Sequence, residues 1–215
     1  MSDTRDSAAA AMTSEGPPSL LDAVGGRLGV AESALPAAAF VVTYTASGQD
    51  TRAAVIAAVA LGVIFAVARL VRGQTLQYAL AGLGGLALSA YVVSRTGKAE
   101  DFFLPGLLAN AAYALAYLVS ILVRWPLLGV IISALRGGDM SWRDDPAAVR
   151  SYSRASWIWV ALFSLRLAVQ LPLYLASALT ALGVARIAMG IPLFAIGIWL
   201  SWLVLRPRER PAAPA

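Results

Sequence analysis

The chain of 215 residues contains no cysteine and no histidine, and Lys98 is its only lysine. Disulfides, thiol nucleophiles and imidazole acid–base catalysis are therefore excluded. Most zinc and haem sites also need these side chains, so we expect no metal and no cofactor. A membrane-embedded enzyme would have to use tyrosine or arginine chemistry alone. The composition therefore favours a protein that is not an enzyme.

Charge is also scarce. Only 13% of the residues are charged, 59% are hydrophobic, and the mean hydropathy is +0.72. A soluble domain would carry about 25% charged residues. Uncharged runs of about 20 residues recur, and this is the length that crosses a hydrocarbon core of about 30 Å. The sequence predicts an all-α, polytopic membrane helix bundle whose partner is the lipid bilayer. The net charge of +5 is explained by arginines placed beside a membrane, so we expect no nucleic-acid partner.

The uncharged runs predict about six transmembrane helices. The expected spans are about 33–49, 52–71, 73–94, 102–123, 155–182 and 184–205. They lie in one transmembrane domain, residues 19–206, between a disordered cytoplasmic tail, 1–18, and a second cytoplasmic tail, 207–215. Residues 136–154 are expected to form a cytoplasmic loop. The apolar stretch 125–135 is too short to cross alone, so we expect it along the interface or as a kinked extension of the fourth helix.

Charge bias orients this bundle. With the N-terminus inside, eleven arginines lie on the cytoplasmic side, whereas Arg52, Arg95 and Lys98 lie outside. Basic residues accumulate in cytoplasmic loops, and tryptophans prefer the membrane interface. All six tryptophans fall at the same, inner side in this topology. We therefore expect both termini to be cytoplasmic.

Arg166 is a single cation inside an apolar run. It is preceded by 11 uncharged residues and followed by 19. A charge at this depth costs at least about 2.5 kcal/mol, so such a residue faces a partner or a wet cavity. Gln170, Tyr174 and Ser177 share its face at helical spacing. Arg186 lies near the outer end of the sixth predicted span, where we expect it to extend to the interface.

The fourth predicted helix carries a second polar face, made of Asn110, Tyr113, Tyr117, Ser120 and Arg124. Glu32, at the inner end of the first helix, is the acid expected to pair with Arg124 or Arg166. Two interpretations fit. Either the two faces form hydrogen bonds between helices, each contributing about 0.6 kcal/mol, or they line a cavity for an anionic or polar small ligand. In the second interpretation the lining residues are Arg166, Gln170, Tyr174, Asn110, Tyr113, Tyr117, Arg124 and Glu32.

Small residues recur on one face of the second and third predicted helices: Ala54, Ala58, Gly62 and Ala66, then Ala81, Gly85 and Ser89. Small side chains let helix backbones approach closely in lipid. The pattern indicates either packing of these two helices on each other or a homodimer interface.

Several stretches resemble a known family. They include GGRLGVAESALP (25–36), RLVRGQ (69–74), TGKAEDFFLPGLLANAAY (96–113), RWPLLG (124–129), SWRDD (141–145) and RLAVQLPLYL (166–175). Over about residues 20–206 the chain resembles uncharacterised actinobacterial integral membrane proteins, grouped as a domain of unknown function. Residues 96–174 are more distantly similar to the septation protein A-like inner-membrane group. The resemblance implies a multi-pass protein of the bacterial plasma (inner) membrane and a six-helix fold, without assigning site residues.

Two functions are consistent with these observations. The first is a small-solute or ion transporter or channel with a polar site around Arg166. The alternative is a non-catalytic envelope or septation-associated membrane scaffold that acts through the loop 136–154.

Overall fold

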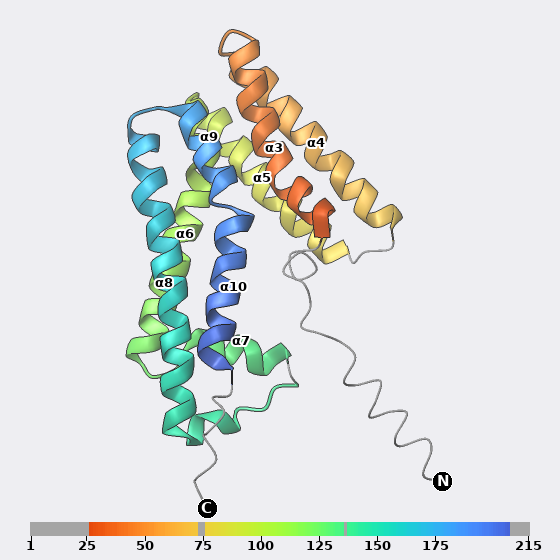
Figure 1. Cartoon of the computed structure of the whole chain (residues 1–215). Coiled ribbons are helices and arrows are strands. Elements are labelled where there is room, and N and C mark those ends of the chain that lie inside the picture. Colours follow the sequence, from red (N-terminus) through yellow and green to blue (C-terminus); the bar gives the residue numbers. More distant parts are fainter. Residues whose placement is uncertain (1–25, 73–75, 136, 207–215) are drawn as a thin grey trace, which may run out of the picture.

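The computed structural model describes residues 26–72, 76–135 and 137–206, and it describes side chains in 34–68, 70–72, 82–135 and 137–206. This part of the chain is helical, without strands (Figure 1). The elements in order are α3 (Gly26–Ala46), α4 (Thr51–Val71), α5 (Leu76–Thr96), η1 (Ala99–Phe103), α6 (Leu104–Leu122), α7 (Leu127–Leu135), η2 (Ser141–Asp144), α8 (Pro146–Leu175), α9 (Leu179–Ala188) and α10 (Ile191–Leu205). The predicted all-helical membrane bundle is confirmed. The two predicted tails, 1–18 and 207–215, lie outside the described residues.

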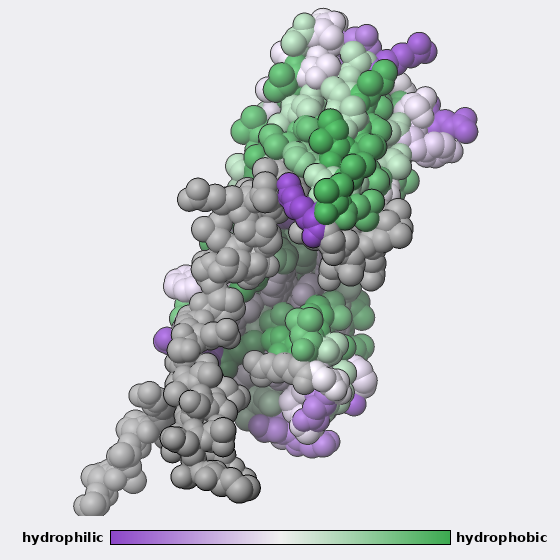
Figure 2. Space-filling model, turned by 90° about the vertical axis from the view of Figure 1, so that its right-hand side faces the viewer, coloured by the Kyte–Doolittle hydropathy of each residue, from purple (hydrophilic) through white to green (hydrophobic). Residues whose placement is uncertain are grey.

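Four stretches of the described chain are long and apolar enough to cross a membrane: Thr51–Ala68, Ala99–Leu122, Pro146–Leu175 and Leu179–Leu205. The apolar helix Ala34–Ala46 is shorter. The predicted number of about six spans therefore becomes four to six. Figure 2 shows apolar side chains covering the upper helices, with polar groups gathered at the top and lower ends. This surface is suited to contact with lipid.

The N-terminal helices α3, α4 and α5 form one group (Figure 1). Asp50 is the N-cap of α4, because its carboxylate accepts hydrogen bonds from the N–H groups of Arg52 at 2.9 Å and Ala53 at 3.1 Å. The preceding turn has positive φ at Gly48 and Gln49, so α3 ends at Ala46 and not at residue 49 as predicted. The helix also includes residues before its predicted start at 33, since Gly26 already belongs to it.

The small-residue face of α4 packs within the molecule. Ala54 and Ala58 are fully buried, and a Cβ at Gly62 would overlap the side chain of Leu86 on α5. Gly82 and Gly85 of α5 are exposed, and a Cβ there would meet open space. Intramolecular packing thus accounts for the small residues of α4. A homodimer through the exposed face of α5 stays a prediction.

The fifth predicted span, 155–182, has different limits in the structure. Asp145 caps α8 by accepting a hydrogen bond from Ala147 N–H at 2.8 Å, and Pro146 occupies the first turn, where a missing N–H is tolerated. The helix thus begins inside the predicted loop 136–154. It ends at Leu175, because Ser177 adopts a positive φ of 52°.

The sixth predicted span, 184–205, is two helices and not one. α9 ends at Ala188, and α10 begins at Ile191, after a break at Met189 and Gly190. Pro192 lies in the first turn of α10, and its ring would clash with a continuous helix through residue 188. The break lies inside an apolar stretch of 27 residues.

The short apolar stretch 125–135 contains α7, which lies across the foot of α8 and α10 (Figure 1). The indole N–H of Trp142 donates to Ser133 Oγ at 2.6 Å and so ties the η2 loop to α7. In the same loop, the backbone N–H and hydroxyl of Ser141 donate to Asp139, and these hydrogen bonds lower the pKa of that exposed carboxyl. The stretch is therefore a separate helix and not an extension of α6, and its place along the membrane interface stays a prediction.

Two apolar clusters form the core. The upper cluster joins α3, α4, η1 and α9 around Phe40, Phe102 and Phe103. The lower cluster joins α6, α7 and α8 around Tyr117, Trp159 and Phe163, with α10 packed against it. Along α8, Phe163 of the lower cluster and Leu173 of the upper cluster are separated by nearly three helical turns.

Candidate functional site

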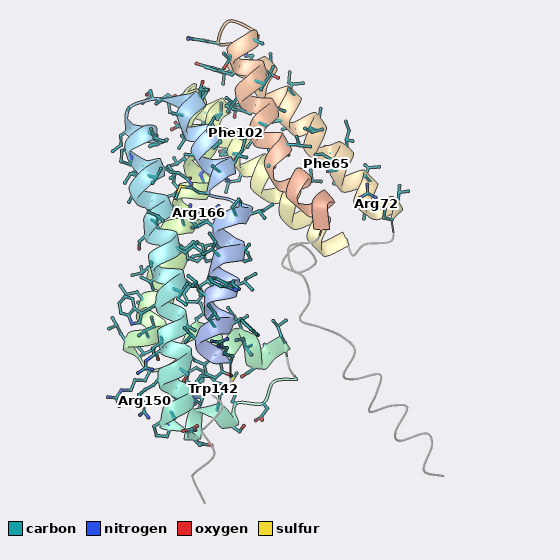
Figure 3. The ribbon with its side chains drawn as sticks, viewed as in Figure 1. Phe65, Arg72, Phe102, Trp142, Arg150 and Arg166 are labelled. Carbon is teal, nitrogen blue, oxygen red and sulfur yellow. The ribbon has the colours of Figure 1, made fainter. Side chains whose placement is uncertain are left out.

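A cavity of about 610 Å³ lies between the two apolar clusters. α3, α6, α8, α9 and α10 all contribute to its wall, and we call it the arginine cavity because Arg166 of α8 and Arg186 of α9 both line it. Arg166 lies nine residues before the end of α8, which is about 14 Å along the helix axis. Figure 3 shows it in the upper half of the bundle, far from Trp142 and Arg150. If α8 ends at the edge of a hydrocarbon core of about 30 Å, this distance would put Arg166 close to the middle of that core.

Neither arginine has a counter-charge in the described part of the chain. The Nε of Arg166 is buried without a hydrogen-bond partner, and neither guanidinium forms an ion pair there. The two positive charges also repel each other. The arrangement therefore leaves positive charge at a depth where water is scarce, and an anion would compensate it.

Two neutral polar side chains also line the cavity. Gln170 is 1% exposed, and both its amide nitrogen and its amide oxygen are buried without a partner. Asn110 of α6 is buried as well. Buried polar groups are normally hydrogen-bonded, and leaving one unpaired costs about 1–3 kcal/mol. Such unpaired groups beside a cavity need a partner, such as a water molecule, an ion or a ligand.

Two glycines allow the cations to occupy this position. The guanidinium of Arg186 packs directly on Gly106 of α6, where a Cβ would overlap its Nη1 atom. Its Cζ also lies 5.5 Å from the ring centroid of Phe103, a cation–π contact. At the break before α10, the Cβ position of Gly190 is 3.9 Å from Nη2 of Arg166. Both guanidinium groups therefore lie against backbone that carries no side chain.

The first turn of α10 adds a backbone donor at the same place. Gly190, Ile191 and Pro192 line the cavity, and no side chain caps this helix. The structure gives no acceptor to the N–H group of Ile191. A helix N-terminus carries about half a positive charge and attracts anions. The helix break thus adds positive potential to that of the arginines.

The remainder of the wall is apolar. It includes Ala34 and Ala37 of α3, and also Ile187 and Phe194, which are 37% and 38% exposed. Below α9, α3 diverges from α10, which packs on α8 (Figure 1). The cavity therefore has a cationic, polar part and an apolar rim.

Comparison with known proteins identifies the family. Residues 24–212 match the family described as Protein of unknown function (DUF3159). The chain belongs to this family. No curated protein and no solved structure matches it significantly.

The structure of this DUF3159 member brings together only part of the predicted site. Asn110, Arg166 and Gln170 line the cavity. Tyr113 is 54% exposed, and its ring is tilted against that of Phe163, at 5.2 Å between ring centroids. Tyr117 is buried in the lower cluster, beside Trp159. Neither tyrosine is among the residues that line the cavity.

The last two predicted residues also lie elsewhere or outside the description. Arg124 is exposed in the turn after α6, with a φ of 56°. The side chain of Glu32 lies outside the described residues, so its pairing with Arg166 stays a prediction. Its helix does reach the site, because Ala34 and Ala37 line the cavity.

Two acids that the sequence interpretation missed hold the end of α8 in this family member. The hydroxyl of Tyr174 donates to Asp101, which is 4% exposed, and Ser177 Oγ donates to Glu100 at 2.8 Å. Both acids belong to η1. Tyr174 thus anchors the helix that carries Arg166, instead of lining the cavity. The two adjacent acids, Glu100 and Asp101, were the signal in the sequence for partners of the polar face of α8.

Arg186 was also missed. Its position near the end of a predicted span suggested an interfacial side chain. In the structure the span is broken after α9, and Arg186 faces the cavity. The sequence Gly190–Ile191–Pro192 was the signal for that break.

Proposed function

We propose that this protein is a multi-pass plasma-membrane transporter or channel of bacteria that carries a small anionic solute, and that the arginine cavity is its binding site. One observation supports this most directly: Arg166 and Arg186 line one cavity near mid-membrane without a counter-charge in the described chain. In this proposal the protein is not an enzyme.

The energetics support a ligand rather than a structural role. Arginines that only connect helices would be paired with an acid or a carbonyl, as Tyr174 and Ser177 are with Asp101 and Glu100. Holding two repelling cations at this depth costs stability, at least about 2.5 kcal/mol for each by insertion scales. Proteins retain such costly groups at substrate and ion pathways.

The broken helix supports the same proposal. Discontinuous helices at the bilayer midplane form the binding sites of many secondary transporters, where half-helix N-termini face anionic groups. α9 and α10 have this arrangement, and their break lies beside Arg166. With both termini cytoplasmic, the end of α8 that is nearer to the cavity lies on the outer side of the membrane.

Anion flux in proteoliposomes tests the proposal. We expect Arg166→Leu to fold, because it removes an unpaired charge, and to abolish anion flux. Arg52→Leu is the matched control, since Arg52 is exposed at the start of α4 and away from the cavity. Flux in Arg166→Leu equal to that of the unmodified protein would contradict the site.

A second candidate function is an envelope or septation-associated scaffold, and the ordered segment after α7 favours it. Arg143, Arg150 and Arg154 are exposed at the foot of the molecule. The guanidinium of Arg143 lies 3.9 Å from the ring centroid of Trp125, which holds the segment in place. The same segment exposes Asp139, Asp144 and Asp145, so it presents charges of both signs, and its arginines are suited to an acidic partner or to anionic lipid.

Affinity capture separates the two candidates. Changing Arg143, Arg150 and Arg154 together to Gln removes the positive charges of this segment and leaves the cavity unchanged. If the scaffold function is correct, the changed protein no longer captures its envelope partners, whatever its anion flux. Unchanged partners would count against it.

A further inference from the structure

We propose that the arginine cavity recognises a phosphate group that retains one proton. This inference rests on the proposed anion site and narrows its ligand to one chemical class. The ligand is either free hydrogenphosphate or a phosphate monoester on a larger, apolar body. Three observations lead to this assignment: the number of hydrogen-bond donors, one acceptor without a partner, and the size and lining of the cavity.

The donors suit an anion with several oxygens. Each guanidinium offers a planar fork of N–H groups, which matches two oxygens of a phosphate. Arg166 and Arg186 provide two such forks, and the first turn of α10 adds the free N–H group of Ile191. A halide has no separate oxygens to engage these directional donors. A tetrahedral oxyanion does.

Gln170 distinguishes among the oxyanions. Its amide nitrogen is a further donor, but its amide oxygen is a buried acceptor without a partner. Sulfate and carboxylates carry no proton at neutral pH, so their oxygens would repel this acceptor. A phosphate group with one remaining O–H donates to it while its other oxygens accept from the arginines. Sites that hydrogen-bond a ligand O–H strongly reject analogues that lack it.

The cavity is larger than phosphate alone requires. Its volume of about 610 Å³ lies within the range of about 300–1,000 Å³ typical of sites for whole organic ligands. Ala34, Ile187 and Phe194 make its remaining wall apolar. A phosphate carried on an apolar body, such as a lipid phosphate, would fill both parts, whereas free hydrogenphosphate would fill the cationic part with water beside it.

Calorimetric titration of the full-length protein in neutral detergent tests the proposal. The probes are inorganic phosphate, sulfate and chloride at pH 7 and constant ionic strength. We expect phosphate to bind about tenfold or more tightly than sulfate, the value of one charge-assisted hydrogen bond. Chloride should be weaker than both. Sulfate binding as tight as phosphate, or no phosphate binding, would overturn the proposal.

Two variants separate recognition from a general loss of structure. Gln170→Met has similar volume and no polar atoms, so it should bring phosphate and sulfate to equal affinity. Arg186→Gln should weaken both anions by about tenfold and leave their ratio unchanged. Arg52→Gln is the control and should change neither. A phosphate preference that survives in Gln170→Met would refute the role of the amide.

Competition distinguishes the two sources of phosphate. Dioctanoyl phosphatidic acid, a monoester, should displace phosphate, and dioctanoyl phosphatidylcholine, a diester without an ionisable O–H, should not. Phosphatidic acid binding tighter than inorganic phosphate supports a lipid source, and the reverse order supports a free one. Displacement by phosphatidylcholine would contradict the requirement for a proton.

Failure of the phosphate inference can be distinguished from failure of the transport proposal. Arg166-dependent flux of another anion without phosphate binding would refute this inference and leave the transport function standing. Phosphate binding without flux would support the inference and refute transport.

Discussion

At the residue scale, the polar groups of α8 have two different roles. Tyr174 is satisfied by Asp101, whereas Arg166 and Gln170 are unsatisfied and line a cavity. The sequence places these residues on one helix face and gives no sign of the difference. Burial and partners make the distinction, because a shared face does not determine which neighbour lies opposite each residue.

Gly106→Ala should disturb the site without unfolding the protein. The added methyl overlaps Arg186 Nη1, and this flexible guanidinium can move only by leaving its place on α6. We expect anion affinity to fall about tenfold, as for loss of one charge-assisted hydrogen bond, with little change in the melting temperature. Gly84→Ala, in open space on α5, is the control. Equal affinities in the two variants would contradict the packing of Arg186 on Gly106.

Tyr174→Phe should destabilise the protein, because the buried carboxylate of Asp101 loses its donor. The expected cost is about 1–3 kcal/mol, measurable as a lower melting temperature in detergent. Tyr113→Phe is the matched control, since Tyr113 is 54% exposed and its hydroxyl has no partner in the described chain. The prediction fails if both variants melt at the same temperature.

At the element scale, close helix contacts determine where the site lies. α9 approaches α3 at Gly183, and α10 approaches α8 at Gly197, where a Cβ would lie 2.8 Å from Leu162 Cδ1. The indole N–H of Trp159 donates to Ser201 Oγ at 3.0 Å and links the same two helices. These contacts hold the two halves of the broken span on different neighbours. The cavity lies between them.

Gly183→Ala should separate α9 from α3. Its Cβ would lie 2.5 Å from Cγ2 of Val41, a β-branched side chain with little rotamer freedom. We expect a loss of about 1–3 kcal/mol, the usual cost of overpacking, seen in thermal melting. Adding Val41→Ala should restore most of it, and Gly85→Ala should have no such effect. A double variant no more stable than Gly183→Ala would argue against this contact.

The helix ends show how far the sequence could lead. Apolar runs predicted the helices, and α4 begins within one residue of its expected start. The start of α8 was missed although Asp145–Pro146 is a strong N-terminal signal, because the charges of 136–154 suggested a loop. The break at Gly190 was missed because an uncharged composition shows that a stretch is compatible with lipid but does not show whether its helix is continuous.

At the scale of the whole molecule, the long helices α3, α4, α5, α6 and α8 alternate in direction, and α10 ends at the lower end (Figure 1). Arg72 lies at the lower end of α4, and Arg150 at the lower end of α8 (Figure 3). This arrangement agrees with the charge bias of the sequence, which predicts that the lower side is cytoplasmic.

Cysteine labelling tests this orientation, and the absence of native cysteine makes it direct. We expect Ser47→Cys, in the turn between α3 and α4, to react with an impermeant maleimide on intact cells. Asp144→Cys, in η2, should react only after the membrane is opened. The reverse pattern would invert the topology and place the arginine cavity nearer the cytoplasm.

The broken last span also has a consequence for biogenesis. Most of the cavity wall comes from α6, α8, α9 and α10, and its far side is supplied only by the last helices of the chain. Chains are made from the N-terminus, so α8 is complete before α9 and α10 exist. Until those last helices are synthesised, they cannot pack beside Arg166. A chain stopped after α8 would leave this charge facing lipid, a defect that membrane quality control could detect.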